Sequence, residues 1–329
     1  MRPKAAAMTT GGSSADSRAK WLVGGAPFLY LMFFFAAPAA LMLLASFRMP
    51  GDYGGLAPLV SEGHPNLTLS SYAGFFASDI YLLLFARSLW YALLTTLICL
   101  AIAYPLAMVI VASPRRWREL LLLLVILPFW SNFLIRVYAW MIILWPEWAL
   151  SRAINAVLAA LGVGPVTLMF SPFAVIVVLV YVHLPFMVLP LYANLEKHDP
   201  TLLDAAQDLG AGPWRRFRYV TWPLSLPGVF AGAALVFIPA FGIFAVPDLV
   251  GGTSGIMIGN VIKQQFLETR DWPFGSVLSI VLTVVALGAT AAAAAVARPR
   301  RTGTAAPGAA AGGTTAGTTA GTTAGAAAA

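Results

Sequence analysis

The sequence predicts an all-α membrane protein with six membrane-spanning helices. Of its 329 residues, 60% are hydrophobic and only 10% are charged, which is too apolar for an ordinary soluble domain. Six apolar runs are long enough to cross a hydrocarbon core, which needs about 20 helical residues. Backbone polar groups must be satisfied internally in lipid, and no run alternates polar with apolar residues. The runs are therefore expected to be helices rather than strands of a barrel.

The helices are expected at defined places along the chain. Residues 1–19 are predicted to be a disordered tail, and residues 20–48 a retained first helix bent by Pro27 and Pro38. A Gly- and Pro-rich external loop covers residues 49–83. Residues 84–297 form the five-helix core, with apolar runs at 88–112, 119–144, 172–194, 224–247 and 274–297. The Ala-, Gly- and Thr-rich tail 298–329 has too few large apolar side chains to fold.

The distribution of charge predicts the orientation of the helices. Fourteen of the 20 Lys and Arg residues lie in or directly beside the two tails, in the second-to-third connection or in the loop 196–223. By the positive-inside rule, both termini and this loop are expected in the cytoplasm. The net charge of +7 does not indicate nucleic-acid binding, because the basic residues flank apolar runs. The single cysteine, Cys99, lies within an apolar run, so no disulfide framework or metal site is expected.

The polar loop 196–223 contains a short predicted helix. Asp199 can cap its first free N–H groups, and Pro200 is preorganised for the first helical position. Gly210 is placed for a left-handed cap after the helix. An apolar stripe with two alanines at its centre would let another backbone approach closely: Leu202, Ala205, Ala206 and Leu209. Periodicity alone leaves two interpretations, a docking element for a soluble partner or a capped amphipathic loop on the lipid headgroups.

This loop resembles the EAA loop of binding-protein-dependent ABC importer permeases. The family pattern is Glu-Ala-Ala, three residues, Gly, nine residues and Ile-x-Leu-Pro. The chain has Asp204-Ala205-Ala206, Gly210 and Val220-Thr-Trp-Pro223 at that spacing. It departs from the pattern by Asp204 for Glu, Val220 for Ile and Trp222 for Leu, and the first two changes are conservative.

Three further segments are similar to the spermidine/putrescine permease branch of that family. They are Leu127–Trp140, Leu184–Tyr192 and Asp271–Gly275, and the resemblance extends over roughly residues 20–297. It implies a bacterial inner-membrane subunit with the type I ABC importer (MetI-like) fold, which alternates between outward-facing and inward-facing states. Its cytoplasmic coupling helix would dock in a groove of an ATPase subunit. The residues implied in this coupling are Asp199, Pro200, Asp204, Ala205, Ala206, Leu209, Gly210 and Pro223.

The resemblance also implies a set of partners. These are a paralogous permease that completes a heterodimer, two ATPase subunits, an external substrate-binding protein and membrane lipid. The chain has no Gly-x4-Gly-Lys-Ser/Thr phosphate loop. It is therefore expected to be no enzyme and to bind no cofactor itself, with ATP and Mg²⁺ used by the partner ATPase.

Two groups of residues are candidates for the substrate path or the outer gate: Trp130, Asn132, Arg136, Tyr138 and Trp140 in one, and Asp248, Glu268 and Asp271 in the other. Arg136 lies 17 residues beyond Glu119, roughly 25 Å along a continuous helix. It is expected near the outer interface, either as a snorkelling or structural arginine in an aromatic belt or as part of the outer gate. Asn132 and His183 are expected to form hydrogen bonds between helices. The acids would pair with polyamine ammonium groups, or serve as solvated loop charges and helix caps.

The leading hypothesis is a permease subunit that imports a small cationic solute such as spermidine or putrescine. One alternative is the same machinery acting on another small solute, such as an amino acid derivative or an oxyanion. A different class, the self-sufficient secondary transporter, predicts ion-coupling acids at mid-depth. The five core runs contain no acid except Glu119 at the start of one run. Gly228-Val-Phe-Ala-Gly232 adds a small-x3-small face suited to close helix packing.

Overall fold

The computed structural model describes residues 25, 27–58, 60–61, 64–162 and 164–297. These residues are mostly helical, and their one sheet is a two-stranded antiparallel pair. Six of the described helices are long and apolar enough to cross a membrane: Pro27–Ser46, Asp79–Ala112, Phe133–Ala160, Pro172–Leu195, Pro213–Gly242 and Trp272–Ala293. The predicted number of spans is confirmed. The predicted tails 1–19 and 298–329 lie outside the described residues.

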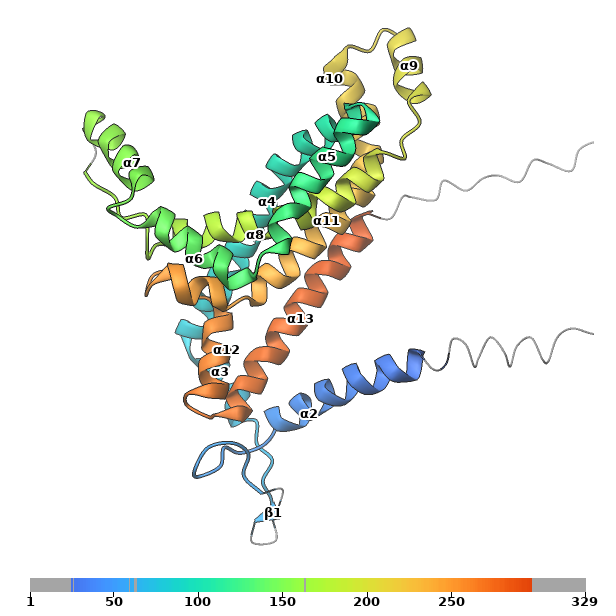
Figure 1. The fold of residues 1–329 in the computed structure, drawn as a ribbon. Helices are drawn as coiled ribbons and strands as arrows, with labels where there is room; N and C mark the ends of the chain where they lie inside the picture. The colour runs from blue at the N-terminus through green and yellow to red at the C-terminus, as the bar shows by residue number, and fades with distance from the viewer. Residues whose placement is uncertain (1–24, 26, 59, 62–63, 163, 298–329) are drawn as a thin grey trace, which may run out of the picture. The chain divides into compact units, whose positions relative to one another are not determined.

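The elements follow one another along the chain and are labelled in Figure 1 where there is room. They are η1 (Met32–Ala36), α2 (Ala37–Ser46), β1 (Val60–Ser61), β2 (His64–Pro65), α3 (Ser70–Ala77), α4 (Asp79–Ala112), α5 (Arg115–Ile126), η2 (Leu127–Trp130), α6 (Phe133–Leu144), α7 (Ala149–Ala160), α8 (Pro172–Leu195), α9 (Thr201–Asp208), α10 (Pro213–Arg216), η3 (Phe217–Thr221), α11 (Trp222–Gly242), η4 (Pro247–Gly251), α12 (Ile258–Leu267) and α13 (Trp272–Ala297).

The centre of the bundle consists of α4, α8 and α11, which pack against one another (Figure 1). Two glycines on α11 allow the close approach to α8 that the small-x3-small pattern predicts. A Cβ on Gly228 would lie 2.6 Å from the Cβ of Asn194, and one on Gly232 would lie 2.7 Å from Sδ of Met187. Real Cβ atoms essentially never come that close, so a side chain at Gly228 would push the helices apart, and one at Gly232 would have to displace the Met187 side chain.

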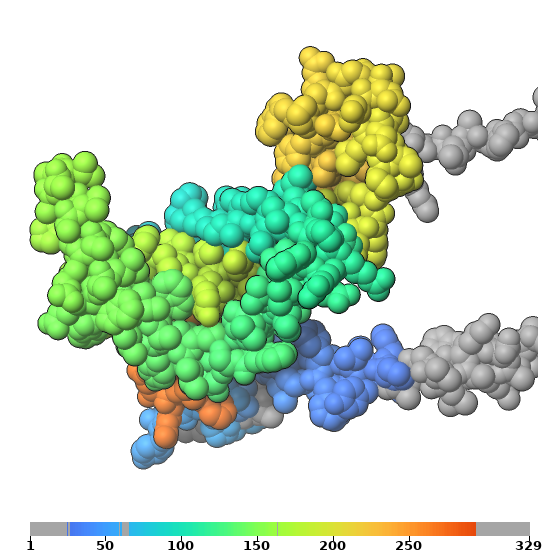
Figure 2. All heavy atoms as spheres, turned by 45° about the horizontal axis from the view of Figure 1, so that its top comes forward, coloured from blue at the N-terminus to red at the C-terminus, as the bar shows by residue number. Residues whose placement is uncertain are grey.

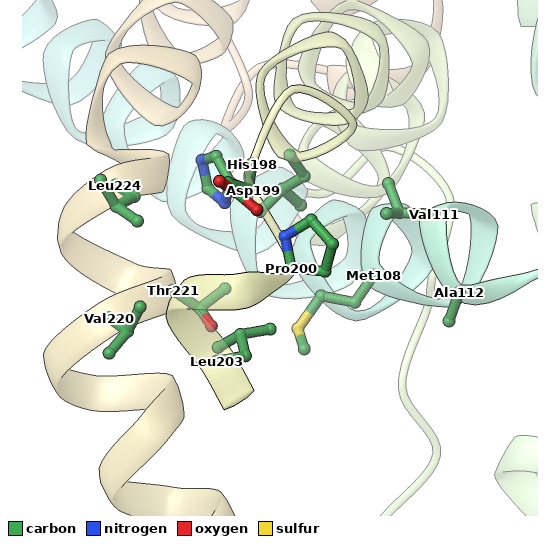
Figure 3. Close-up of a pocket in the computed structure, with 11 residues that line it drawn as sticks. Met108, Val111, Ala112, His198, Asp199, Pro200, Leu203, Val220, Thr221 and Leu224 are labelled. Carbon is green, nitrogen blue, oxygen red and sulfur yellow. The ribbon is translucent and has the colours of Figure 1, made fainter. Parts of the chain in front are cut away.

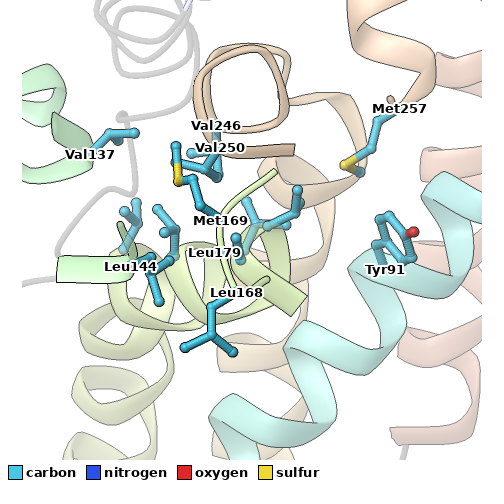
Figure 4. Close-up of a cluster of buried hydrophobic side chains, with 13 residues drawn as sticks. Tyr91, Val137, Leu144, Leu168, Met169, Leu179, Val246, Val250 and Met257 are labelled. Atoms are coloured by element: carbon cyan, nitrogen blue, oxygen red, sulfur yellow. The ribbon is translucent and has the colours of Figure 1, made fainter. Parts of the chain in front are cut away.

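A buried apolar cluster attaches the neighbouring elements to α8 (Figure 4). Val137 and Leu144 reach it from α6, Leu179 from α8, and Val246 and Val250 from the η4 region. All five side chains are almost completely buried. The cluster therefore fixes α6 and η4 on the central helix.

The third span differs from the prediction of one helix over 119–144. The chain forms α5, a 3₁₀ turn over Leu127–Trp130 and then α6, with Ser131 and Asn132 outside both helices. Pro128 has no N–H to continue the helical ladder, and Asn132 starts the next helix as its N-cap. The prediction was wrong because hydropathy is continuous across the break.

Other boundaries also move. The second helix begins at Asp79 rather than at residue 88, and α3 and α7 lie in segments that the sequence predicts as connections. The fifth span is helical from Pro213 to Gly242 rather than over 224–247. At the predicted bend, the turn before Pro38 is the π-helical turn η1. Pro38 has no N–H to donate to the carbonyl of Phe34, four residues earlier in η1. Residues 20–24 and 26 of the predicted first helix lie outside the described residues.

Candidate functional site

The predicted helix of the polar loop is present as α9, and its start is capped as expected. Oδ1 of Asp199 accepts a hydrogen bond from the backbone N–H of Thr201 at 3.0 Å. Pro200 already has helical angles, with φ −62° and ψ −25°. The Thr201 backbone hydrogen bond holds the pKa of the Asp199 carboxyl below its ordinary value. The sequence signals for the helix start are confirmed.

The end of α9 is a Schellman cap. Gly210 has φ +79°, a conformation that residues with a Cβ rarely adopt. The N–H of Ala211 donates to the carbonyl of Ala206 at 3.0 Å, and the N–H of Gly210 donates to the carbonyl of Gln207 at 2.8 Å. The helix is therefore fixed at both ends by its own sequence.

The apolar stripe of α9 faces outward rather than into the bundle. Leu209 is 89% exposed, and Leu202 and Ala205 are also exposed, while Ala206 is half-buried. Figure 2 shows the α9 and α10 segments in yellow as part of the exposed surface. Apolar side chains presented in this way outside the long helices are typical of a surface that a partner covers.

An apolar pocket of about 290 Å³ lies beside the root of α9 (Figure 3). Met108 and Val111 line it from the end of α4, Leu203 from α9, and Thr221 and Leu224 from the start of the fifth span. The pocket separates the loop from the ends of two membrane helices. At this point α9 is therefore not packed solidly against the bundle, whereas Phe217 and Trp222 farther along the loop pack on Tyr104 of α4.

One polar contact connects the two helices of the loop, and another connects the loop to the bundle. Nη1 of Arg216 on α10 donates to Oε1 of Gln207 on α9 at 2.7 Å. Nη1 of Arg118 on α5 donates to Oε1 of Glu196, the residue after α8, at 2.9 Å. The sequence reasoning missed both pairs. Arg118 and Glu196 are 78 residues apart, and no periodicity or motif relates them.

Arg136 is buried, which disfavours the snorkelling alternative; its position near the outer interface stays a prediction. Its side chain is 9% exposed, and its guanidinium carbon lies 5.1 Å from the ring centroid of Phe129. Nε and Nη1 have no hydrogen-bond acceptor among the described residues. The predicted distance between Glu119 and Arg136 assumed one continuous helix. The chain instead breaks at Leu127–Asn132, and Phe129 in this break lies near the guanidinium.

The other residues of that candidate group do not converge on Arg136. Trp130 and Tyr138 are exposed, and Trp140 packs on Tyr181 of α8 with ring centroids 5.5 Å apart. Oδ1 of Asn132 accepts from the N–H of Leu134 at 2.8 Å, so it caps α6. The expectation that Asn132 bonds between helices is wrong. The five residues form no single site among the described residues.

His183 follows the same local pattern. Its Nδ1 lies 2.8 Å from the carbonyl of Leu179, one turn earlier in α8, and the ring is buried. The predicted hydrogen bond between helices is therefore made within one helix instead.

Replacing Arg136 by Met is expected to raise the unfolding temperature of the isolated chain in detergent by a few degrees. Burying a guanidinium without an acceptor costs free energy, and Met fills similar space without that charge. Arg152→Met is the control, because Arg152 is exposed on α7 and its loss should change little. A thermal-shift measurement of both variants checks this, and a lower midpoint for Arg136→Met would mean that the guanidinium already has a stabilising partner.

The acidic candidates serve mainly as pairs and caps. Nζ of Lys263 donates to Oδ2 of Asp248 at 2.7 Å, and Asn260 donates to the other carboxylate oxygen. The hydrogen bond to Asp248 is the main cause that raises the pKa of Lys263 above its ordinary value. Oδ1 of Asp271 accepts from the N–H of Phe274 at 3.1 Å at the start of α13, and Glu268 is exposed. Within the described residues, the arrangement favours the alternative of loop charges and caps.

The segment that carries these acids turns sharply at its glycines. Gly252 has φ +57°, and a Cβ on Gly255 would lie 2.5 Å from the Cα of Gly251. The described part of the chain contains no group of three His, Cys, Asp or Glu residues that could hold a metal ion.

Residues 70–302 match the family model described as "Binding-protein-dependent transport system inner membrane component". The spermidine/putrescine transport system permease protein PotB of Salmonella typhimurium (strain SL1344) is 48% identical over 220 residues, 66% of this chain and 75% of that protein. PotB of Haemophilus influenzae is 41% identical over 265 residues, 78% of this chain and 87% of that protein.

A solved structure supports the fold. It is a bacterial alginate ABC transporter in complex with an alginate pentasaccharide-bound periplasmic protein, and its matching chain superposes with a TM-score of 0.65. The match covers 86% of this chain and 96% of the other at 17% sequence identity. The predicted MetI-like importer fold is confirmed.

Proposed function

The chain belongs to the family of binding-protein-dependent transport system inner membrane components, and on that premise we propose that it imports polyamines such as spermidine and putrescine by an ATP-driven mechanism. It is a multi-pass inner-membrane permease of the ABC importer class, in the polyamine branch. The observation that carries the choice of solute is its identity of 48% and 41% to two spermidine/putrescine permeases.

The ATP-powered movement of the ATPase subunit is transmitted to this permease through α9. A short helix that is capped at both ends keeps its shape without support from the bundle. Its exposed apolar stripe supports a role as the docking surface of an ATPase subunit, which uses ATP and Mg²⁺. The excess of Lys and Arg beside this loop supports a cytoplasmic position for the loop and for both termini.

The complete importer would contain this chain, a paralogous permease, two ATPase subunits and an external substrate-binding protein. The solute path would run between the two permeases. The aromatic side chains would hold the methylene groups of a polyamine, and acidic groups would face its ammonium groups. Asp248 is already paired with Lys263. Asp271 caps α13 with one carboxylate oxygen, so the exposed Glu268 is the better candidate on this chain.

Proteoliposomes that contain the complete complex test this proposal. The substrate-binding protein is supplied on the side of the vesicle to which the external face of the complex points. We expect saturable, ATP-dependent uptake of labelled spermidine. Unlabelled putrescine should inhibit this uptake by competition, and sulfate should not. Competition by anions alone would redirect the assignment to an oxyanion. Uptake by the chain without ATPase subunits would favour a secondary transporter.

A further inference from the structure

Arg118 connects three elements at the root of the coupling loop. It lies near the start of α5, and its Nη2 donates to the carbonyl of Val111, in the last turn of α4, at 2.7 Å. Its Nη1 donates to Oε1 of Glu196, directly after α8, at 2.9 Å. Carbonyls in the last turn of a helix have no partner within that helix, so Arg118 satisfies a group that α4 leaves free.

Glu196 accepts the hydrogen bond from Arg118 and lies one turn beyond Tyr192 of α8. A hydrogen bond with Tyr192, on the last turn of α8, is the main cause that lowers the pKa of the Glu196 carboxyl, and the hydrogen bond with Arg118 lowers it further. The carboxylate therefore stays ionised at neutral pH. Glu196 is also the first residue of the loop that leads to α9, so on the α8 side of the loop a movement of α9 reaches the bundle at this residue.

A second ion pair of the same residue types shows what is special about this one. Arg115 and Glu119 lie one turn apart on α5, 3.6 Å from each other, with 93% and 72% of their side chains exposed. Such a pair contributes little and connects a helix only to itself. The side chains of Arg118 and Glu196 are 26% and 43% exposed, and they join elements far apart in the sequence.

We propose that Arg118 is the positioning residue through which the coupling loop moves α4 and α5. The proposal rests on the proposed ATP drive through α9 and adds the route by which that drive enters the bundle. The apolar pocket beside the loop leaves room between Leu203 and the end of α4 at Met108, so packing there is not solid. The Arg118 contacts with Glu196 and Val111 thus provide a directed, polar connection that holds the loop root against the end of α4.

The first test measures uptake per ATP hydrolysed by the assembled complex in proteoliposomes. R118Q and E196Q should each lower this ratio by about tenfold, while ATP hydrolysis and the yield of complex stay near those of the wild type. The double variant R118E/E196R should recover part of the loss, because the ion pair is rebuilt although the bond to Val111 is not. R115Q is the matched control and should behave like the wild type.

The proposal is wrong if R118Q and R115Q give the same ratio, or if uptake, hydrolysis and complex yield all fall in parallel.

A second measurement is independent of the solute. Spin labels at cysteines replacing Trp117 on α5 and Asp208 on α9 should keep one distance with and without ATP in the wild type, and separate on ATP binding in R118Q. A wild-type distance that itself changes with ATP would overturn the proposal. If the wild type takes up no polyamine, the proposed solute fails while this distance measurement still decides the role of Arg118.

Discussion

Arginine in place of Ala205 should reduce ATP-driven uptake by more than about tenfold, while the chain still enters the membrane and the bundle still folds. Ala205 is exposed on α9, between Leu202 and Leu209 on the outward-facing stripe. A small side chain there lets a partner backbone approach closely, and a long charged one would hold the partner away and bring an unpaired charge into the contact. Uptake and ATP hydrolysis by the reconstituted complex measure the effect.

The control for this variant is Ala77→Arg. Ala77 is an exposed alanine on α3, which has 8 residues like α9. The two substitutions make the same chemical change on two short exposed helices. Equal activity of the two variants would remove α9 from the coupling mechanism.

Leucine in place of Gly228 should destabilise the folded chain by at least about 1–3 kcal/mol, the usual cost of overpacking. A Cβ at this position would lie 2.6 Å from the Cβ of Asn194 and 3.2 Å from the carbonyl oxygen of Pro190. Neither atom can rotate away, because both are fixed to the backbone of α8. The two central helices must therefore separate, which also disturbs the neighbouring contact at Gly232.

Gly288→Leu is the matched control for the packing prediction. Gly288 lies on α13, another long apolar helix, and a Cβ there meets no atom within 4 Å. Thermal unfolding and size-exclusion profiles in detergent compare the two variants. Similar stability of both would mean that α11 and α8 are not held at the close distance described here.

Sequence patterns predicted the elements whose signals are local. The fourth span was expected over 172–194 and is Pro172–Leu195, and the last was expected over 274–297 and is Trp272–Ala297. The ends of α9 follow from Asp199 and Gly210, because each residue acts on the backbone next to it. Local chemistry of this kind does not depend on the rest of the fold.

The features that were missed depend on tertiary structure or on weak interruptions of hydropathy. The break at Leu127–Asn132 lies in a continuously apolar run, where Pro128 was the available signal. Phe129, which lies near the guanidinium of Arg136, belongs to that break, so the missed boundary also hid a contact of a candidate site residue. The contact between Arg118 and Glu196 joins segments that only the packing of α5 against α8 brings together.

Photo-crosslinking at Leu209 tests most directly the central claim that α9 is where an ATPase subunit drives this permease. The native Leu209 is 89% exposed. Benzoylphenylalanine at this position should form an adduct with the ATPase subunit in the assembled complex. The same probe at Leu267, which is 69% exposed at the end of α12, should form none. An intact, transporting complex in which Leu209 crosslinks only to lipid or to another permease would contradict the account.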